Sequence, residues 1–522
     1  MDDWWRRAVI YQIYPRSFQD SNGDGVGDLP GITRRLDHVA ELGADAIWLS
    51  PFFPSPMDDM GYDVADYRDV DPVFGTLADF DALVDHAHGL GLKVMIDQVL
   101  NHSSDRHPWF AESRRSREGL RADWYVWADP RPDGTPPNNW QSVFGGPAWT
   151  WDARRRQFYL HNFLASQPDL NFHNPEVQAA VLDAMRFWLD RGVDGFRLDT
   201  VNYYVHDAEL RDDPPLGWNG PVPPAKPYDM QRHVHSKNRP ENLAFIERMR
   251  ALTDEYRARA LMGEVGETAG ATPVMAEYTR GPSRLHMAYS FEMLGARIDA
   301  GFVRGRLEEF FDLADDGWPC WSLSNHDVPR HVSRHAPEGQ EEAFARCAAA
   351  MLLSLRGTPC LYQGEETGQL ETEMELHELT DPSGIAFWPE DKGRDGCRTP
   401  MVWEKAPQGG FTEGTPWLPV KAPQAERSVA SQLGREGSVL ETYRALLAFR
   451  RSRPALHSGD IAFGGGDGPV LDFERRAEGG GLRCRFNLST QTVDIAVGST
   501  VGPSQGVGEG RMEPWGFAFE EF

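Results

Sequence analysis

Residues 195–200 read GFRLDT, a short apolar run that ends in polar residues, and this pattern decides the fold. Seven other segments share the pattern, at residues 8–18, 44–53, 93–102, 261–265, 287–293, 320–327 and 358–366. Short apolar runs that are buried on both faces are typical of parallel strands. The sequence therefore predicts eight parallel strands that carry polar residues at their carboxyl ends.

Helical periodicity fills the intervals between these strands. PEVQAAVLDAMRFWLDRG (175–192) starts with proline and stops at glycine, and EEAFARCAAAMLLSLRG (341–357) likewise ends at a glycine. Eight alternating units favour an α/β protein with a closed TIM (β/α)8 barrel, whose reactive face is the carboxyl end of the strands. An open doubly wound sheet is the alternative, but no GxGxxG motif follows the first strand.

Two regions depart from the barrel pattern. Residues 103–170, after the third strand, are rich in Trp, Pro, Asn and Gly and hold too many aromatic residues for a flexible linker. We interpret them as an inserted subdomain beside the mouth of the barrel. Residues 457–522 change to short strands with glycine turns, which indicates a C-terminal antiparallel β domain. The barrel is then expected in two parts, residues 1–102 and 171–456.

The composition restricts the class of partner. The 522 residues carry a formal net charge of −26, which repels nucleic acid and anionic lipid, so neither a nucleic acid nor a membrane is an expected partner. No signal segment or membrane-spanning apolar run is evident, and the five cysteines form no CxxC pair. We expect a cytoplasmic protein without a disulfide framework, and the sequence leaves its oligomeric state open.

Acidic residues stand at or near four predicted strand ends: Asp97, Asp199, Glu264 and Asp327. Carboxylates held close together raise one another's pKa, so their convergence indicates chemistry. Glycoside hydrolysis needs such an arrangement, because a retaining enzyme combines an ionised nucleophile with a protonated acid. The pattern favours a glycoside hydrolase whose partner is a small neutral sugar.

Asp199 is the candidate nucleophile. Arg197 precedes it by two residues, so strand alternation places both side chains on one face, where the guanidinium is expected to keep the carboxyl group ionised. Glu264 is the candidate acid/base. Its neighbour Glu267 lies beyond the strand and is expected to be a solvated loop residue.

Seven motifs together resemble the α-amylase superfamily (glycoside hydrolase family 13), and within it the α-glucosidase and oligo-1,6-glucosidase branch. They read GYDVADY (61–67), DQVLNH (97–102), QPDLN (167–171), GFRLDT (195–200), GEV (263–265), SNHD (324–327) and RDGCRTPM (394–401). Each string is short, but all occur in the family's order and with the spacing of the barrel. The resemblance implies a retaining, exo-acting α-glucosidase that removes terminal glucose from short substrates.

The resemblance also implies roles for single positions. Asp199 would be the nucleophile, Glu264 the general acid/base and Asp327 the residue that stabilises the transition state. The implied sugar-binding residues are Asp59, Tyr62, His102, Phe144, Phe163, Arg197, Thr200, His326 and Arg398. Asp97 and Asn101 are implied to brace Arg197 and the strand ends.

Thr200 follows the candidate nucleophile and is implied to face the leaving sugar. In this family valine at that position accompanies α-1,6 cleavage, whereas threonine or alanine accompanies α-1,4 cleavage. The simpler alternative is that Thr200 is only a β-branched strand residue. We expect α-1,4 bonds such as that of maltose to be cleaved, with transglucosylation as a further outcome.

Residues 20–28 read DSNGDGVGD, which offers oxygen ligands for a hard divalent cation at alternate positions. An EF-hand is excluded, because its twelfth position is Gly31 rather than glutamate. The resemblance implies a structural Ca²⁺ or Mg²⁺ site that uses Asp20, Asn22, Asp24, the Val26 carbonyl and Asp28. A solvated loop without metal is the alternative.

Three other functions stay open from the sequence. A glucosyltransferase or isomerase of the same fold shares the glycosyl-enzyme intermediate, and an α-1,6-glucosidase shares the catalytic residues. The remote alternative is a non-catalytic binding subunit built on an amylase barrel, which is disfavoured because this chain keeps Asp199, Glu264 and Asp327.

Overall fold

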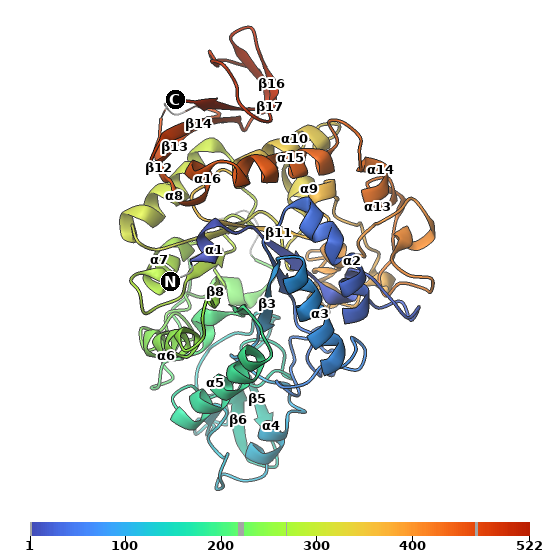
Figure 1. The fold of residues 1–522 in the computed structure, drawn as a ribbon. Helices are drawn as coiled ribbons and strands as arrows, with labels where there is room; N and C mark the ends of the chain where they lie inside the picture. The colour runs from blue at the N-terminus through green and yellow to red at the C-terminus, as the bar shows by residue number, and fades with distance from the viewer. Residues whose placement is uncertain (1–2, 218–223, 268, 465–467) are drawn as a thin grey trace.

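The computed structural model describes residues 3–217, 224–267, 269–464 and 468–522. Its largest sheet has eight strands, all parallel, which confirms the predicted barrel architecture (Figure 1). They are β1 (Ile10–Ile13), β2 (Ala46–Leu49), β3 (Lys93–Gln98), β7 (Gly195–Leu198), β8 (Ala260–Val265), β9 (Met287–Ser290), β10 (Cys320–Ser322) and β11 (Thr358–Tyr362).

The sheet closes on itself. Its strands follow the order β10-β11-β1-β2-β3-β7-β8-β9, and a parallel bridge between Ala288 and Pro319 joins the last strand to the first. The main helices that connect the strands are α2 (Leu29–Leu42), α3 (Leu77–Gly89), α5 (Pro175–Asp190), α6 (Asn242–Asp254), α7 (Ala271–Thr279), α8 (Ala300–Leu313), α10 (Glu341–Leu352) and α15 (Val439–Arg451).

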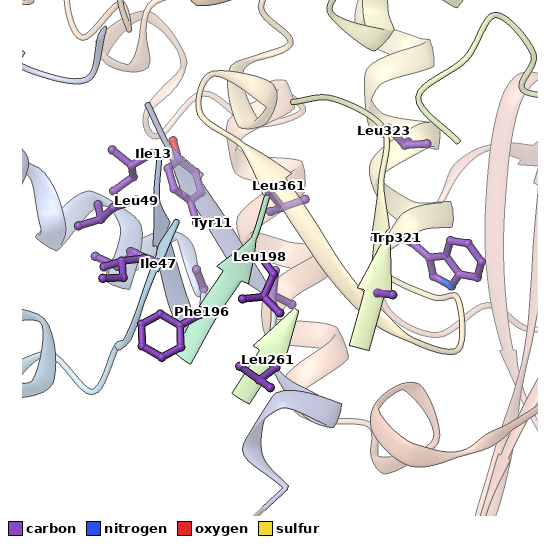
Figure 2. Packing of buried hydrophobic residues seen from close by; sticks show 14 of the residues in the cluster. Tyr11, Ile13, Ile47, Leu49, Phe196, Leu198, Leu261, Trp321, Leu323 and Leu361 are labelled. Carbon is purple, nitrogen blue, oxygen red and sulfur yellow. The ribbon is translucent and has the colours of Figure 1, made fainter. Parts of the chain in front are cut away.

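Alternate residues along each strand pack on opposite sides of the barrel wall. Ile10, Trp48 and Met95 belong to a buried cluster inside the barrel. Tyr11 and Ile47, which neighbour two of them in sequence, belong to a larger cluster shared with the apolar faces of the surrounding helices. Figure 2 shows this outer packing on several strands. Both faces of the sheet are therefore buried, as the continuous apolar runs predicted.

The predicted strands were too long at their carboxyl ends. β1 stops at Ile13, and Pro15 opens a short 3₁₀ turn (Pro15–Ser17). β7 stops at Leu198, one residue before Asp199. Several candidate site residues therefore lie in the loops that follow the strands.

The region between β3 and β7 has its own small sheet. It holds α4 (Pro108–Ser113) and three antiparallel strands in the order β4-β6-β5, namely β4 (Trp127–Ala128), β5 (Trp149–Asp152) and β6 (Gln157–Leu160). A separate buried cluster surrounds Trp140 and Trp149. The aromatic residues of this region thus form a packed core, while the domain boundaries stay a prediction.

The C-terminal part is an antiparallel sheet, as predicted. Its strands are β12 (Asp460–Phe463), β13 (Val470–Ala477), β14 (Gly480–Asn487), β15 (Val493–Asp494), β16 (Gln505–Gly508) and β17 (Arg511–Glu521). It contacts α8 and α10 of the barrel (Figure 1). Buried Arg475 fastens it there, because its Nη1 donates a 2.6 Å hydrogen bond to the carbonyl of Ser354.

The long segment between β11 and α15 holds only short elements. They include η4 (Glu365–Thr367), η5 (Leu376–Glu378), α11 (Pro382–Phe387), α12 (Asp395–Arg398), α13 (Ala422–Ala425) and α14 (Val429–Gln432). Of these, the sequence analysis recognised only the motif around α12. The five cysteines are buried and free. In the described parts of the chain, no helix combines the length and the apolar character needed to cross a bilayer.

Candidate active site

A cavity of about 1390 Å³ opens at the carboxyl ends of the barrel strands. Its walls include the three candidate catalytic residues: Asp199 from the loop after β7, Glu264 from β8 and Asp327 from the loop after β10. Six of the predicted binding residues also line it: Asp59, Tyr62, His102, Phe144, Phe163 and Thr200. The other three, Arg197, His326 and Arg398, are buried behind the wall and contact residues that line it.

Fully buried Arg197 joins three carboxyl groups. Its Nη1 lies 2.8 Å from Asp97 Oδ1 and 2.6 Å from Asp199 Oδ1, and its Nη2 pairs with Glu264 Oε1. The register of β3 and β7 sets Asp97 directly beside Arg197. We call these four residues the Arg197 cluster. The predicted contact between Arg197 and the candidate nucleophile is present, and so is the bracing by Asp97.

The Arg197 cluster holds more carboxyl groups than its guanidinium can neutralise. Burial raises the pKa of Asp97, Asp199 and Glu264 to about 7, although Arg197 acts to lower each pKa. One cation beside three carboxylates leaves excess negative charge in a desolvated site, so a proton is retained there near neutral pH. We expected Arg197 to keep Asp199 ionised, but burial outweighs the guanidinium.

A second cluster contains two arginines. Arg394 Nη2 lies 2.7 Å from Asp59 Oδ1, and its Nε lies 3.0 Å from Asp381 Oδ1. Arg398 Nη2 lies 3.0 Å from Asp327 Oδ1. We call these five residues the Arg394–Arg398 cluster. It surrounds the candidate transition-state stabiliser with fixed positive charge.

The Arg394–Arg398 cluster lowers the pKa of two of its three carboxyl groups. Burial acts to raise the pKa of Asp381, but the arginines outweigh it and lower this pKa to about 2. Burial is likewise outweighed at Asp327, whose pKa is held well below its ordinary value by His326, Arg398 and Arg394. Asp59 is the exception, because burial raises its pKa despite both arginines.

Arg394 was missed by the sequence analysis, which named only Arg398. The motif RDGCRTPM held the signal, since the two arginines are four residues apart and lie on one face of a helical turn. Arg394 is the residue just before α12 (Asp395–Arg398). Its guanidinium also lies 5.0 Å from the ring centroid of Phe144. It therefore joins the aromatic wall to the acidic residues.

Tyr62 and the two histidines form a buried polar group beside these clusters. The ring of Tyr62 stacks on His326 with centroids 5.3 Å apart, and its hydroxyl donates to Asp97 Oδ2 at 3.2 Å. His326 Nε2 lies 3.2 Å from Asp327 Oδ2, and His102 Nε2 lies 3.1 Å from the Tyr62 carbonyl. Burial lowers the pKa of His102 to about 4 and holds the pKa of His326 well below its ordinary value.

The aromatic wall consists of Phe144 and Phe163, whose ring centroids are 6.1 Å apart. Phe163 also lies 5.1 Å from the ring of His102. Asn101 does not brace Arg197: its side chain lies 3.3 Å from His102 Nδ1, and its carbonyl accepts from the Leu170 amide. It therefore fixes the loop after β3 rather than the guanidinium.

Thr200 is not a strand residue, because β7 ends at Leu198. Its backbone is left-handed, with φ 41° and ψ 46°, a conformation that a β-branched residue rarely adopts. This conformation aims its amide at Glu264 Oε2, at 3.0 Å, and its hydroxyl at Asp199 Oδ2, at 3.2 Å. Thr200 thus contacts both candidate catalytic carboxyl groups.

The expectation that Glu267 is a solvated loop residue was wrong. Its carboxylate accepts from Lys237 Nζ at 2.9 Å and from Asn238 Nδ2 at 2.6 Å. Lys237 is itself buried and donates to the hydroxyls of Tyr203 and Tyr228. Lys237 and Asn238 lie in the loop 224–240 and contact Glu267 only after the chain has folded, so no local sequence pattern indicated this contact.

The loop 20–28 presents oxygen ligands, but its acids are occupied. Asp20 accepts from the amides of Asn22, Gly23 and Gly25 and from the Thr412 hydroxyl. Asp28 accepts from Ser21 and from the Gly31 amide. Among the described residues, no three His, Cys, Asp or Glu side chains are grouped as a metal site requires. The donor set suits a hard cation, and the Ca²⁺ or Mg²⁺ site stays a prediction.

Comparison with known proteins places the chain in a family. Residues 12–459 match the alpha amylase catalytic domain. The chain is 58% identical over 495 residues to a probable alpha-glucosidase of Rhizobium meliloti (strain 1021), covering 94% of this chain and 90% of that protein. It is 39% identical over 533 residues to an oligo-1,6-glucosidase of Heyndrickxia coagulans, covering 95% and 94%. The crystal structure of the alpha-glucosyl transfer enzyme XgtA superposes with a TM-score of 0.95 at 53% identity, covering 99% of each chain.

The closed barrel and its acidic mouth define a glycoside hydrolase. The chain belongs to the alpha-amylase family, glycoside hydrolase family 13, as its motifs predicted, and the two relatives from Rhizobium meliloti and Heyndrickxia coagulans are named as glucosidases.

Proposed function

We propose that this enzyme is a retaining, exo-acting α-glucosidase that hydrolyses terminal α-1,4-linked glucose from short substrates such as maltose. One observation carries the proposal: Asp199 and Glu264 both contact the guanidinium of Arg197 at the cavity. Retaining enzymes hold their two carboxyl groups about 5–5.5 Å apart, whereas inverting enzymes leave roughly 6.5–9.5 Å for a water molecule. A shared guanidinium supports the closer arrangement.

In the proposed first step an Asp199 oxygen forms a bond to C1 of the glucose as the bond from C1 to the glycosidic oxygen breaks. Glu264 gives its proton to that oxygen, so the leaving sugar departs as a neutral alcohol. In the second step Glu264 takes a proton from water, whose oxygen attacks C1 and releases Asp199. Retention of a proton by the Arg197 cluster near pH 7 supports this exchange of roles.

The Arg394–Arg398 cluster supports recognition of a terminal glucose. Asp59 and Asp327 offer carboxyl oxygens to sugar hydroxyls from the cavity wall. Arg398, buried behind the wall, donates from Nη2 to Asp327 Oδ1 at 3.0 Å and so fixes the position of that acceptor. A site that satisfies several hydroxyls of one ring discriminates strongly against substrates that lack them. We therefore assign this cluster to the glucose that is released.

The linkage is proposed from Thr200, which contacts both candidate catalytic carboxyl groups and which the family resemblance assigns to the side of the leaving sugar. The second candidate is α-1,6 cleavage, which the oligo-1,6-glucosidase relative favours. Transglucosylation is a further candidate outcome, supported by the likeness to an alpha-glucosyl transfer enzyme.

Two experiments test the proposed function. Proton NMR of the first-formed glucose should show the α-anomer, and β-glucose appearing first would contradict retention. Rates on maltose, isomaltose, sucrose, trehalose, starch and an aryl α-glucoside, with product analysis at high sugar concentration, should rank maltose above isomaltose and reveal transfer products. Absence of turnover on every substrate would favour the non-catalytic alternative.

We also propose that the loop 20–28 holds a structural Ca²⁺ or Mg²⁺ through Asp20, Asn22, Asp24, the Val26 carbonyl and Asp28. A ligand that binds only the folded state raises the melting temperature. Removal of divalent ions with a chelator should lower it, and added Ca²⁺ or Mg²⁺ should restore it. The variant Asp24→Asn should weaken this response, whereas a melting temperature indifferent to chelator would refute the site.

A further inference from the structure

We propose that Tyr289 is a positioning residue that, together with Arg197, fixes which oxygen of Glu264 carries the catalytic proton. This inference rests on the proposed role of Glu264 as acid/base. Tyr289 does not line the cavity, and neither the motifs nor the comparisons assign it a role. Its hydroxyl nevertheless lies 2.9 Å from Glu264 Oε1.

The contact follows from the backbone. Glu264 on β8 and Tyr289 on β9 are paired in the register of these neighbouring parallel strands. Both side chains are buried, and Tyr289 belongs to the cluster inside the barrel, where its ring lies 6.1 Å from that of Trp48. The position of the tyrosine hydroxyl is therefore set by the barrel and not by a flexible loop.

Counting hydrogens fixes the direction of the bond. Arg197 donates to the Tyr289 hydroxyl from Nε at 3.1 Å and from Nη2 at 2.9 Å. A guanidinium is always protonated and only donates, so these two contacts occupy the acceptor capacity of the tyrosine oxygen. The single hydroxyl hydrogen of Tyr289 is left for Glu264 Oε1.

The two oxygens of Glu264 then differ. Oε1 accepts from the Tyr289 hydroxyl and pairs with the positive charge of Arg197 Nη2, and both contacts disfavour a proton on this oxygen. Oε2 receives one donor in the described structure, the Thr200 amide at 3.0 Å. A protonated Glu264 therefore carries its hydrogen on Oε2. In the first step that hydrogen passes to the glycosidic oxygen as the C1–O bond breaks, and the new charge on Glu264 is stabilised by the donors already facing Oε1.

The test removes only the hydroxyl, with Tyr289→Phe, and compares two substrates. The leaving sugar of maltose needs a proton, whereas the phenolate of 2,4-dinitrophenyl α-glucoside leaves without one. General acid catalysis contributes about 10²–10⁴-fold, so partial misplacement of the proton should lower kcat/KM for maltose about tenfold or more. The value for the aryl glucoside should stay within about threefold.

The pH profile gives a second readout. A carboxylate that loses a hydrogen-bond donor has a higher pKa. The basic limb of kcat/KM for maltose should therefore move to higher pH in Tyr289→Phe. Replacement of Tyr289 by 3-fluorotyrosine, whose hydroxyl is more acidic, should move the basic limb to lower pH. This conservative variant also keeps the test available if the phenylalanine variant folds poorly.

Tyr443→Phe is the matched control. It deletes an equally buried hydroxyl that donates to a carboxylate, Glu365 Oε1 at 3.1 Å, away from the cavity lining. Its substrate ratio and pH profile should match those of the wild type. Equal losses on both substrates with an unmoved basic limb in Tyr289→Phe, or no loss at all, would overturn the inference. A wild-type enzyme that inverts or leaves both substrates intact would instead defeat the proposed function.

Discussion

The two charged clusters of the active site contain the same number of carboxyl groups but different numbers of arginines. In the Arg197 cluster one guanidinium faces three carboxyl groups, and burial raises all three pKa values to about 7. In the Arg394–Arg398 cluster two guanidinium groups face three carboxyl groups, and the pKa values of Asp327 and Asp381 are lowered.

The difference separates two tasks within one cavity. Three carboxyl groups that share a single positive charge retain a proton that can be exchanged, which acid/base catalysis needs. The second arginine of the other cluster lowers the pKa values of Asp327 and Asp381 and holds their geometry, which recognition of neutral hydroxyls needs. The number of arginines, rather than the number of acids, thus distinguishes a reacting region from a binding region.

Loss of the nucleophile tests the Arg197 cluster most severely. Asp199→Asn should lower kcat/KM at least about 10⁴-fold, because the amide cannot form the ester with C1. Steady-state rates on an aryl α-glucoside measure the effect, and circular dichroism should show an intact fold. The control Asp183→Asn removes an exposed carboxylate of α5 and should leave activity unchanged. Rates like those of the wild type from a clean Asp199→Asn preparation would remove Asp199 from this role.

Arg394→Met should make the Arg394–Arg398 cluster resemble the Arg197 cluster, since a single arginine then faces Asp59, Asp327 and Asp381. Truncating one partner of a buried charge pair costs roughly 2–5 kcal/mol, so kcat/KM for maltose should fall about 10²-fold, mainly through KM. Arg304→Met breaks an exposed pair with Glu308 and is the control. An unchanged KM would show that Arg394 does not serve binding.

The pH dependence of stability distinguishes the clusters. The folded-state pKa of Glu264, about 7, lies above its ordinary value of 4.5, so the native state keeps a proton that the unfolded state has released. Wild-type stability therefore falls as pH rises from about 4.5 to 7. Glu264→Gln lacks this titration, and the wild type loses about 3 kcal/mol of unfolding free energy through it. The melting temperature of the variant minus that of the wild type should therefore increase by a few degrees from pH 5 to pH 8. A difference that does not vary with pH would contradict the raised pKa.

Thr200→Val gives the smallest expected effect. It removes the hydroxyl that donates to Asp199 and puts a methyl group in its place, at the position that the proposed function assigns to the side of the leaving sugar. Loss of one such hydrogen bond corresponds to roughly 0.5–1.5 kcal/mol, so the ratio of kcat/KM for isomaltose to that for maltose should rise about two- to tenfold. If the ratio stays constant, Thr200 does not select the linkage.

Much of the Arg197 cluster could be predicted from the sequence, because it lies on strands. The apolar runs located β7 and β8, and the two-residue spacing of Arg197 and Asp199 indicated their shared face. Tyr289 escaped prediction although it also lies on a strand. Its contact with Glu264 depends on the register between β8 and β9, which no local pattern encodes.

The Arg394–Arg398 cluster was less predictable for a different reason. Asp59, Asp381 and Arg394 lie in segments without periodicity, and Asp59 is far along the chain from the other two, so it meets them only when the barrel closes. Family motifs indicated Asp59 and Arg398, whereas Arg394 and Asp381 followed only from the structure. The pairing of Glu267 with Lys237 has the same origin, since it depends on how a long loop returns to the barrel mouth.

The left-handed backbone of Thr200 has a consequence for how this molecule can change over generations. A threonine at φ 41° holds about 1–3 kcal/mol of strain that a glycine at the same position would release. Selection for thermal stability alone would favour that glycine, but a more flexible backbone would no longer hold the amide of residue 200 in position to donate to Glu264. Higher stability and catalytic turnover therefore favour different residues at position 200, and the native sequence has the residue that favours turnover.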